Sequence, residues 1–357
     1  MAAYTTIDDP EAYFQTVLYT GNGSANNAIT LPGDTDMQPD LVWIKNRDAT
    51  DNHCLFDAVR GATKVLTTNL GNVVGANEVT DTDTLDSFTS DGFQVDADVK
   101  VNTSSEDYVA WCWKANGTGS ANTSGSINTT ATSANATAGF SIIDFVGNAT
   151  GGATIGHGLG AVPHYMWLHV RNADESGPIV YHVGNTSAPE TDYLQGSETA
   201  ATIDSTTAWN DTAPTSTLIS LGTDSHVNYN TKNMICYAWT GIQGFSKFGS
   251  YVGNGNADGA FIYTGFKPAF VILKETTTTS QWYTFDNKMN PHNLMVNATH
   301  PDLNNAETTD NALDFLSNGF KIRKTSTDLN TDGNSHIFMA WAEAPLVNSE
   351  GVPNNAR

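Results

Sequence analysis

An internal repeat constrains this chain of 357 residues more than any other feature. A segment that begins with proline and continues with apolar residues occurs three times, and a segment ending in tryptophan closes each copy. The proline and the closing tryptophan lie 74, 76 and 73 residues apart, at Pro39 and Trp113, Pro163 and Trp239, and Pro268 and Trp341. This constant spacing predicts three tandem copies of one domain of about 100 residues.

Further landmarks keep the same register. A Gly-Asn turn precedes each proline, at 20–23, 146–149 and 252–255. Copies one and three share a Gly-Phe hairpin segment (88–95 and 315–322), which copy two has lost. They also share an aromatic-Asp step, LFDAVRG and YTFDNKMN. Outside the turns no Asp, Glu or His recurs in all three copies, so we interpret the repeated part as scaffold and expect any binding site in loops where the copies differ.

The composition and the periodicity predict an all-β fold. The chain is rich in Thr, Asn, Ser, Gly and Asp and poor in strong helix formers. Short apolar or alternating segments separated by turn clusters are typical of a β-sandwich or jelly-roll. Asp91-Gly92 and Asn318-Gly319 are expected to form hairpin turns in which glycine supplies the positive φ. Two helical turns are expected, one after Asp9-Pro10 and one at 309–316.

We therefore expect three tandem β-sandwich or jelly-roll-like domains. The boundaries are an N-terminal arm at 1–15, copy one at 16–115, a Thr/Asn/Ser/Gly linker at 116–138, copy two at 139–243, copy three at 244–346 and a C-terminal tail at 347–357. The linker is almost devoid of large apolar residues, which indicates a flexible or extended segment. Copy one is expected to be placed more independently than copies two and three.

Charge and cysteine content exclude several classes of protein. A formal net charge of −22 argues against nucleic-acid binding and against attachment to an anionic membrane. The N-terminus lacks the basic and apolar regions of a signal peptide, and no apolar run is long enough to span a bilayer. Cys112 and Cys236 lie in apolar segments, which favours buried packing over a disulfide or a reactive thiol.

No catalytic constellation emerges. His157 lies in the glycine-rich turn GHGLG without a nucleophile elbow or a zinc-binding helix, so a hydrogen-bonded turn histidine is the favoured interpretation. The glycine-rich segment 253–259 lacks the lysine and the helix that phosphate binding requires. Carboxylates are so abundant that pairs of them carry no information. We expect neither catalytic residues nor a cofactor.

Two weaker signals concern binding. Asp328, Asn330 and Asp332 precede Gly333 at alternate positions, like the start of a calcium loop, but the twelfth position is Met339, which cannot ligate. A calcium site and a polar hairpin are both left open there. Trp209 and Trp282 lie in polar segments and would suit glycan stacking, unless they fold back onto the sandwich.

The landmarks taken together resemble a repeat domain of virion proteins of tailed bacteriophages, often marine ones. The resemblance rests on TTIDDPEAYFQTVLYTGNG, PDLVWIKNRD, LFDAVRG, SDGFQV and YVAWCWKA, and on matching segments of the later copies. It covers nearly the whole chain, is weakest across 185–233, and carries no catalytic residues with it.

The resemblance implies a non-enzymatic structural protein on the particle surface, as a tail fibre or appendage involved in host attachment. A capsid decoration protein is the alternative. A glycan-binding adhesin module and a polysaccharide-degrading enzyme are alternatives of other classes. The expected partners are other virion proteins, further copies of the chain (a trimer in a fibre) and a host-surface glycan. The expected location is the virion, after synthesis in the host cytoplasm.

Overall fold

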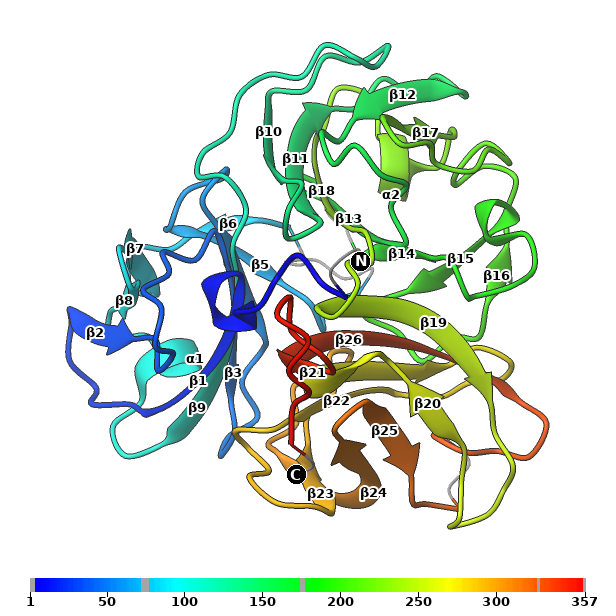
Figure 1. Ribbon diagram of the computed structural model, residues 1–357. Helices are drawn as coiled ribbons and strands as arrows, with labels where there is room; N and C mark the ends of the chain where they lie inside the picture. Colours follow the sequence, from blue (N-terminus) through cyan, green and yellow to red (C-terminus); the bar gives the residue numbers. More distant parts are fainter. Residues whose placement is uncertain (1–3, 72–76, 174–176, 326–327, 356–357) are drawn as a thin grey trace.

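The apolar runs of the sequence form β-strands in three lobes around a common axis (Figure 1). The computed structural model describes residues 4–71, 77–173, 177–325 and 328–355. Lobe 1 consists of η1 (Pro10–Ala12), β1 (Phe14–Thr20), β2 (Asn27–Thr30), β3 (Leu41–Asn46), β4 (Cys54–Asp57), β5 (Lys64–Thr67), β6 (Val79–Thr80), β7 (Leu85–Thr89), β8 (Gly92–Val95), α1 (Val99–Asn102) and β9 (Asp107–Trp113).

The other two lobes share the main strands of lobe 1 but differ in their additional elements. Lobe 2 consists of β10 (Ala131–Asn135), β11 (Phe140–Val146), β12 (Ala153–Gly156), β13 (Tyr165–Val170), β14 (Ile179–His182), η2 (Pro189–Thr191), β15 (Asp192–Gln195), β16 (Ile203–Asp204), β17 (Leu218–Leu221), α2 (Ser225–Asn228) and β18 (Asn233–Trp239). Lobe 3 consists of β19 (Ser246–Val252), β20 (Phe261–Tyr263), β21 (Phe266–Glu275), β22 (Trp282–Asp286), β23 (Met295–Ala298), β24 (Thr308–Leu316), β25 (Gly319–Ile322) and β26 (Ser335–Pro345).

Each lobe is a sandwich of two antiparallel sheets. The larger sheets run β1-β9-β3-β4-β5-β6, β10-β11-β18-β13-β14-β15-β16 and β19-β26-β21-β22. The smaller sheets run β2-β8-β7, β12-β17 and β20-β25-β24-β23. The closing tryptophan strand lies between β1 and β3 in lobe 1, between β11 and β13 in lobe 2, and between β19 and β21 in lobe 3. The all-β prediction and the three sandwich-like domains are confirmed.

The two expected hairpins form at the expected places. Gly92 has the expected positive φ, at 131°, whereas Gly319 does not. A second constraint acts on both glycines. Gly92 and Gly319 are the first residues of β8 and β25, one position after each turn. A Cβ on either would lie only 2.1 Å from the carbonyl oxygen of Ile29 or 2.0 Å from that of Ile262. Close approach of the neighbouring strand therefore requires glycine at both positions.

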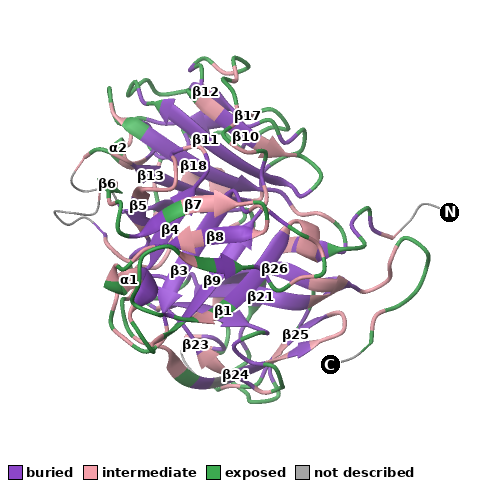
Figure 2. Cartoon of the chain, turned by 90° about the vertical axis from the view of Figure 1, so that its left-hand side faces the viewer, coloured by how far each residue is buried: buried purple, intermediate pink, exposed green. Residues whose placement is uncertain are grey.

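The larger sheet of each lobe is buried on both faces. In lobe 1 the side chains of Val42 and Ile44 pack into the core of the sandwich, and those of Leu41 and Trp43 pack toward the axis. Every residue of β3 and of β13 is buried. Figure 2 shows buried residues along these strands, with the two chain ends on the same side of the molecule. Burial on both faces explains why these segments are continuously apolar.

Three tryptophans meet where the lobes join. Trp113, Trp239 and Trp341 are at most 3% exposed, and their ring centroids lie 5.4 to 6.1 Å apart. The three interplanar angles are 67°, 72° and 73°, so each ring presents an edge to a neighbour. Aromatic pairs favour this arrangement because of their quadrupoles. Each lobe thus contributes its closing tryptophan to one shared centre.

The same backbone hydrogen bond joins each lobe to the next. The donating N–H groups belong to Glu78, Thr202 and Glu307, and the accepting carbonyls to Arg171, Thr276 and Arg47, at 2.8, 3.0 and 2.8 Å. The accepting residues are equivalent by strand register. Lobe 1 therefore docks on lobe 2, lobe 2 on lobe 3, and lobe 3 on lobe 1, which closes a ring.

The last residue of β4, of β14 and of β22 forms a second contact between each lobe and the next, in the same direction around the ring. Asp57 accepts from the hydroxyl of Tyr237 at 2.7 Å, and Asp286 accepts from the indole N–H of Trp111 at 3.2 Å. His182 occupies the equivalent position in lobe 2, with Nε2 at 3.1 Å from the carbonyl of Phe338. Burial lowers the pKa of His182 to about 3, which keeps the imidazole neutral with its proton on Nε2. The aromatic-Asp step of the sequence is thus a contact between lobes.

A buried asparagine recurs in all three lobes, and the sequence analysis missed it. Asn102, Asn228 and Asn330 are fully buried, and each lies 11 residues before a closing tryptophan. Their Oδ1 atoms accept from the backbone N–H of the Gly-Asn turn, at Asn22, Asn148 and Asn254, over 2.9, 2.8 and 3.0 Å. Their amide groups donate to backbone carbonyls nearby. The repeat therefore does conserve one polar cluster, and its role is to hold a turn.

Three expectations about local structure need correction. The segment 309–316 forms β24 instead of a helix, because it pairs with β25 across the Asn318-Gly319 hairpin. Residues 131–135 of the expected linker form β10 and pair with β11. Lobe 1 is not placed independently, because Trp113 and Asp286 bind it to both neighbours.

The N-terminal segment also differs from a free arm. Residues 1–3 lie outside the described residues, but the Thr5 hydroxyl donates to the carbonyl of Gln243 and Ile7 is 2% exposed. The expected helical turn is present as η1, capped by Asp9. No helix in the described residues has the length and apolar character needed to cross a membrane.

The buried asparagines generate a stability prediction. Replacing Asn330 with alanine should lower the free energy of unfolding by about 2–3 kcal/mol, because buried backbone groups lose their partners. Asn256→Ala, an exposed change in the turn that Asn330 holds, should cost under about 0.5 kcal/mol. Urea denaturation of both variants measures the difference, and equal stabilities would contradict the assigned role.

Candidate functional site

Neither of the two tryptophans considered as glycan platforms is exposed. Trp209 is 1% exposed and its indole N–H donates to the carbonyl of Asp192 at 2.9 Å. Trp282 is 2% exposed and donates to the carbonyl of Gln195 at 3.0 Å. Trp209 packs in the core of lobe 2, and Trp282 packs at the contact between lobes 2 and 3. Both side chains have folded back onto the sandwiches, so neither ring presents a face to a ligand.

The residues of the possible calcium loop do not converge on one point. Asn330 is the buried asparagine of lobe 3, and its amide is committed to the turn. Asp328 accepts from the hydroxyls of Ser280 and Tyr283, at 3.2 and 3.1 Å. Asp332 lies beside Gly255 on the exposed turn. Within the described residues there is no group of three or more His, Cys, Asp or Glu placed to hold a metal ion.

The cysteines and His157 occupy structural positions. Cys54, Cys112 and Cys236 are buried and unpaired, as expected of core residues. Burial raises the pKa of Cys54 to about 12, so the reactive thiolate is suppressed. His157 is buried, and its Nδ1 accepts from the N–H of Leu159 at 3.2 Å. These side chains stabilise the sandwiches and offer no nucleophile.

Open space occurs at equivalent junctions between lobes. β1 and β19 are edge strands of their sheets, and a cavity lies beside each of them, against the preceding lobe. In lobe 2 the equivalent strand β11 is covered, because β10 pairs along its edge. The segment before β10 also binds there, where the N–H of Asn116 donates to the Ser133 hydroxyl at 2.8 Å. The added strand in lobe 2 therefore closes the third position.

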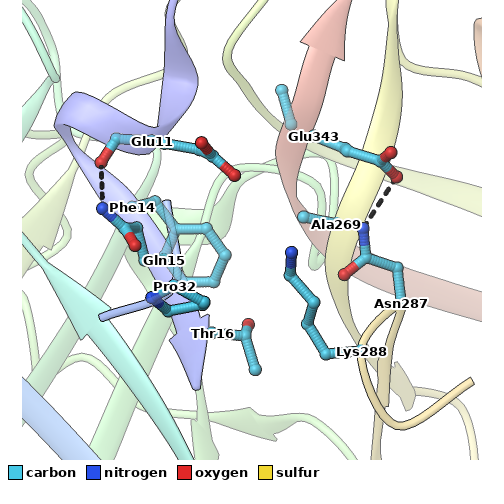
Figure 3. Close-up of a pocket in the computed structure, with 10 residues that line it drawn as sticks. Glu11, Phe14, Gln15, Thr16, Pro32, Ala269, Asn287, Lys288 and Glu343 are labelled. Carbon is cyan, nitrogen blue, oxygen red and sulfur yellow. Dashed lines mark hydrogen bonds between the residues drawn. The ribbon is translucent and has the colours of Figure 1, made fainter. Parts of the chain in front are cut away.

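The cleft between lobes 3 and 1 is small (Figure 3). Its volume is about 20 Å³, which holds about one water molecule. Glu11 and Glu343 face it from opposite sides, and Lys288 reaches in between them. Glu343 is bound to Lys267 and Asn287, each at 2.7 Å, and Glu11 accepts from the N–H of Asp34. Two carboxylates in a water-sized cleft leave no room for a sugar ring between them.

The cavity between lobes 2 and 3, called here the lobe 2–3 cavity, is the larger one. It has a volume of about 400 Å³ and opens to solvent. Its lining combines aromatic and polar residues and contains no carboxylate: Tyr4, His164, Gly241, Gln243, Ser246, Lys247, Phe248, Tyr263, Thr264 and Gly265. Most of these residues differ in type from their equivalents at the other two junctions. The lining of the lobe 2–3 cavity therefore does not follow the pseudo-threefold repeat.

Hydrogen bonds fix the walls of the lobe 2–3 cavity. The Tyr4 hydroxyl donates to the carbonyl of Gly265 at 2.9 Å and lies 3.1 Å from the hydroxyl of Tyr263. Burial, together with Tyr263, raises the pKa of Tyr4 to about 12. The Nδ1 of His164 accepts from the N–H of Gly241 at 2.9 Å, and burial lowers the pKa of this histidine. Both groups are therefore neutral at ordinary pH.

Lys247 supplies the positive charge of the lobe 2–3 cavity. Its Nζ donates to the carbonyl of Tyr263 at 2.7 Å and lies 5.2 Å from the centroid of the Tyr263 ring. Partial burial lowers its pKa below the usual lysine value. No carboxylate of the described residues lies within ion-pair distance of this ammonium group. The ammonium is therefore held in place with donor capacity to spare.

A carboxyl with a strongly raised pKa lies away from both cavities. Burial raises the pKa of Asp302 to about 7, although the N–H of Trp282 donates to it and Lys274 is near. Burial lowers the pKa of Lys274 to about 8. A perturbed pKa is a common property of catalytic groups. Asp302 is only 5% exposed, however, and packs under the contact between lobes 3 and 2, where it meets no substrate.

The three lobes and the shared aromatic centre define an all-β protein built from three sandwich-like domains. The chain belongs to the family described as a domain of unknown function (DUF7483), whose model matches residues 9–345. One family model thus spans all three lobes. None of the curated proteins matched the chain in a search.

Asp302 generates a prediction of pH dependence. Its pKa is higher in the folded state than the ordinary value of 3.8, so the folded state holds a proton that the unfolded chain has lost. Stability should therefore fall as the pH rises from about 4 to about 7. Asp302→Asn should remove this loss and be more stable than the parent by about 2–4 kcal/mol at pH 8.

Denaturation at several pH values tests this prediction. The exposed change Asp332→Asn controls for the loss of one negative charge. Parallel profiles for the parent and Asp302→Asn would contradict the raised pKa.

Proposed function

We propose that this chain is a structural protein of a bacteriophage virion, exposed on the particle as a tail fibre or tail appendage with a role in host attachment. The sequence resemblance to virion proteins of tailed phages supports the proposal. The closed ring of three sandwiches also supports the proposal. The ring is a rigid scaffold, and the contacts that recur in each lobe join one lobe to the next. The net charge of −22 suits a hydrated external surface.

The observation that carries the proposal is that the residues recurring in all three lobes have structural roles. The three tryptophans, the three docking hydrogen bonds and the three buried asparagines all serve packing or turn geometry. A polysaccharide-degrading enzyme would need an open groove with two carboxylates. The larger cavity is lined by no carboxylate, and the cleft with Glu11 and Glu343 is water-sized. These features favour a scaffold with a binding role over an enzyme.

A capsid decoration protein is the second candidate. One chain with pseudo-threefold symmetry would fit a threefold position of a capsid lattice. Both chain ends lie on one side of the molecule (Figure 2). The whole opposite side could then face either the capsid surface or the solvent. In a fibre, by contrast, we propose that further copies of the chain associate through outer faces of the lobes, since the axis is already filled within one chain.

Imaging of purified particles with antibodies raised against the folded chain tests this proposal. Label on the tail or its appendages is the expected result. Label spread over the head would instead establish the decoration alternative. Mass spectrometry of the same particles provides the decisive control, because a chain missing from intact virions but abundant in the lysate would refute a virion role of either kind.

A further inference from the structure

We propose that the lobe 2–3 cavity binds an acidic saccharide, with Tyr263 and Phe261 as the stacking surface and Lys247 as the partner of the sugar carboxylate. The biological use of such binding, host attachment, rests on the proposed function. The binding itself is a property of the isolated chain and can be tested without the particle.

The stacking surface comes from an edge strand with outward aromatic side chains. Phe261 and Tyr263 are each 46% exposed, whereas Ile262 between them is 6% exposed. Alternate residues of a strand share a face, so the two rings form a row that leads to the cavity. Tyr4 extends the aromatic wall, with its hydroxyl 3.1 Å from that of Tyr263. Aromatic rings with a polar tip suit the mixed surface of a sugar.

This row is unique to lobe 3. The strand registers place Ala28 and Thr30 of lobe 1 at the positions of Phe261 and Tyr263. In lobe 2 the same positions hold Thr154 and Gly156. The other two lobes form their sandwiches without aromatic side chains at these positions, so the exposed row is not a requirement of the repeated fold. Their presence in lobe 3 alone therefore indicates binding.

The charge of the cavity selects an acidic ligand. The chain carries 38 Asp and Glu against 16 Lys and Arg, yet the ten residues of the lining include one lysine and no carboxylate. The residues equivalent to Lys247 are Gln15 and Ser141, which are buried at their junctions. Lys247 holds its Nζ at the inner end of the aromatic row by donating to the carbonyl of Tyr263. An ammonium group without a carboxylate partner attracts an anion.

The size of the cavity agrees with a sugar ligand. A volume of about 400 Å³ lies within the range of small-molecule sites, about 300 to 1,000 Å³. Tyr263 lines the cavity and Phe261 lies on the same face of β20, so one sugar ring can occupy the cavity while the next lies over Phe261. The position of Lys247 then places the carboxylate on the inner ring.

Titration calorimetry on the full chain tests the proposal. The probes are trigalacturonate, trimannuronate and 3′-sialyllactose, with maltotriose and lactose as neutral comparisons. At least one acidic probe should bind with a Kd of about 1 mM or tighter at low ionic strength. It should bind at least about tenfold more tightly than the neutral probes and more weakly as salt is added.

Two variants separate the contributions of the ring and the charge. Tyr263→Ala should weaken binding of the acidic probe at least about tenfold, and Lys247→Gln should abolish the preference for acidic over neutral sugar. Thr30→Ala, at the equivalent exposed position of lobe 1, should leave binding unchanged. Circular dichroism melting confirms that each variant is folded.

Several results would overturn the inference. These are failure of all three acidic probes to bind, equal binding of the neutral probes, or unchanged binding in Tyr263→Ala or Lys247→Gln. Self-association of the parent that is lost in Tyr263→Ala, without sugar binding, would assign the row to a contact between copies. None of these results bears on whether the chain is found in virions, so failure here leaves the proposed function standing.

Discussion

The fold depends on burying both faces of each large sheet. One face is covered by the small sheet of the same lobe, and the other carries Trp43, Trp111 and Trp113 or their equivalents, which no part of that lobe covers. Leaving such a surface in water would cost several kcal/mol for each large aromatic side chain. Closure of three lobes around the tryptophan centre removes this cost. A single lobe would expose that face, so the repeat is stable as a ring and not as separate domains.

The closure also explains where function is placed. Contacts that repeat three times, such as the docking hydrogen bonds, are committed to the ring and leave little freedom for specialisation. The junctions at the edge strands are free of that constraint, and they have diverged. One is closed by β10, one holds the water-sized cleft, and one opens as the lobe 2–3 cavity. The proposed ligand site uses residues that differ between copies, but Lys247, Phe261 and Tyr263 lie on strands β19 and β20 and not in the loops where a binding site was expected.

The sequence predicted the repeat, the all-β class and the turns, because these depend on the spacing of residue types along the chain. It did not predict the ring, because an apolar run such as LVWIKN indicates a buried strand without indicating what buries its second face. The placement of Trp209 and Trp282 was left open for a related reason: both lie in polar segments, but their indoles donate to backbone carbonyls in the interior.

The buried asparagine was detectable in the sequence. The interval of 11 residues between it and the closing tryptophan is identical in all three copies. The alternating Asp328, Asn330 and Asp332 resemble a calcium loop within one copy, and this local pattern hides the position that Asn330 shares with Asn102 and Asn228. The cavity, by contrast, joins Tyr4, His164 and Tyr263 from distant parts of the chain, and only the three-dimensional structure could bring them together.

Hydrogen exchange of the three closing strands tests the central claim, that the lobes form one cooperative unit. If the ring is the unit of stability, the slowest amides of β9, β18 and β26 should exchange with the same free energy of opening. Trp341→Ala, although confined to lobe 3, should then lower that free energy equally in all three strands. Strands that open at separate free energies, with the effect of Trp341→Ala limited to β26, would contradict the account.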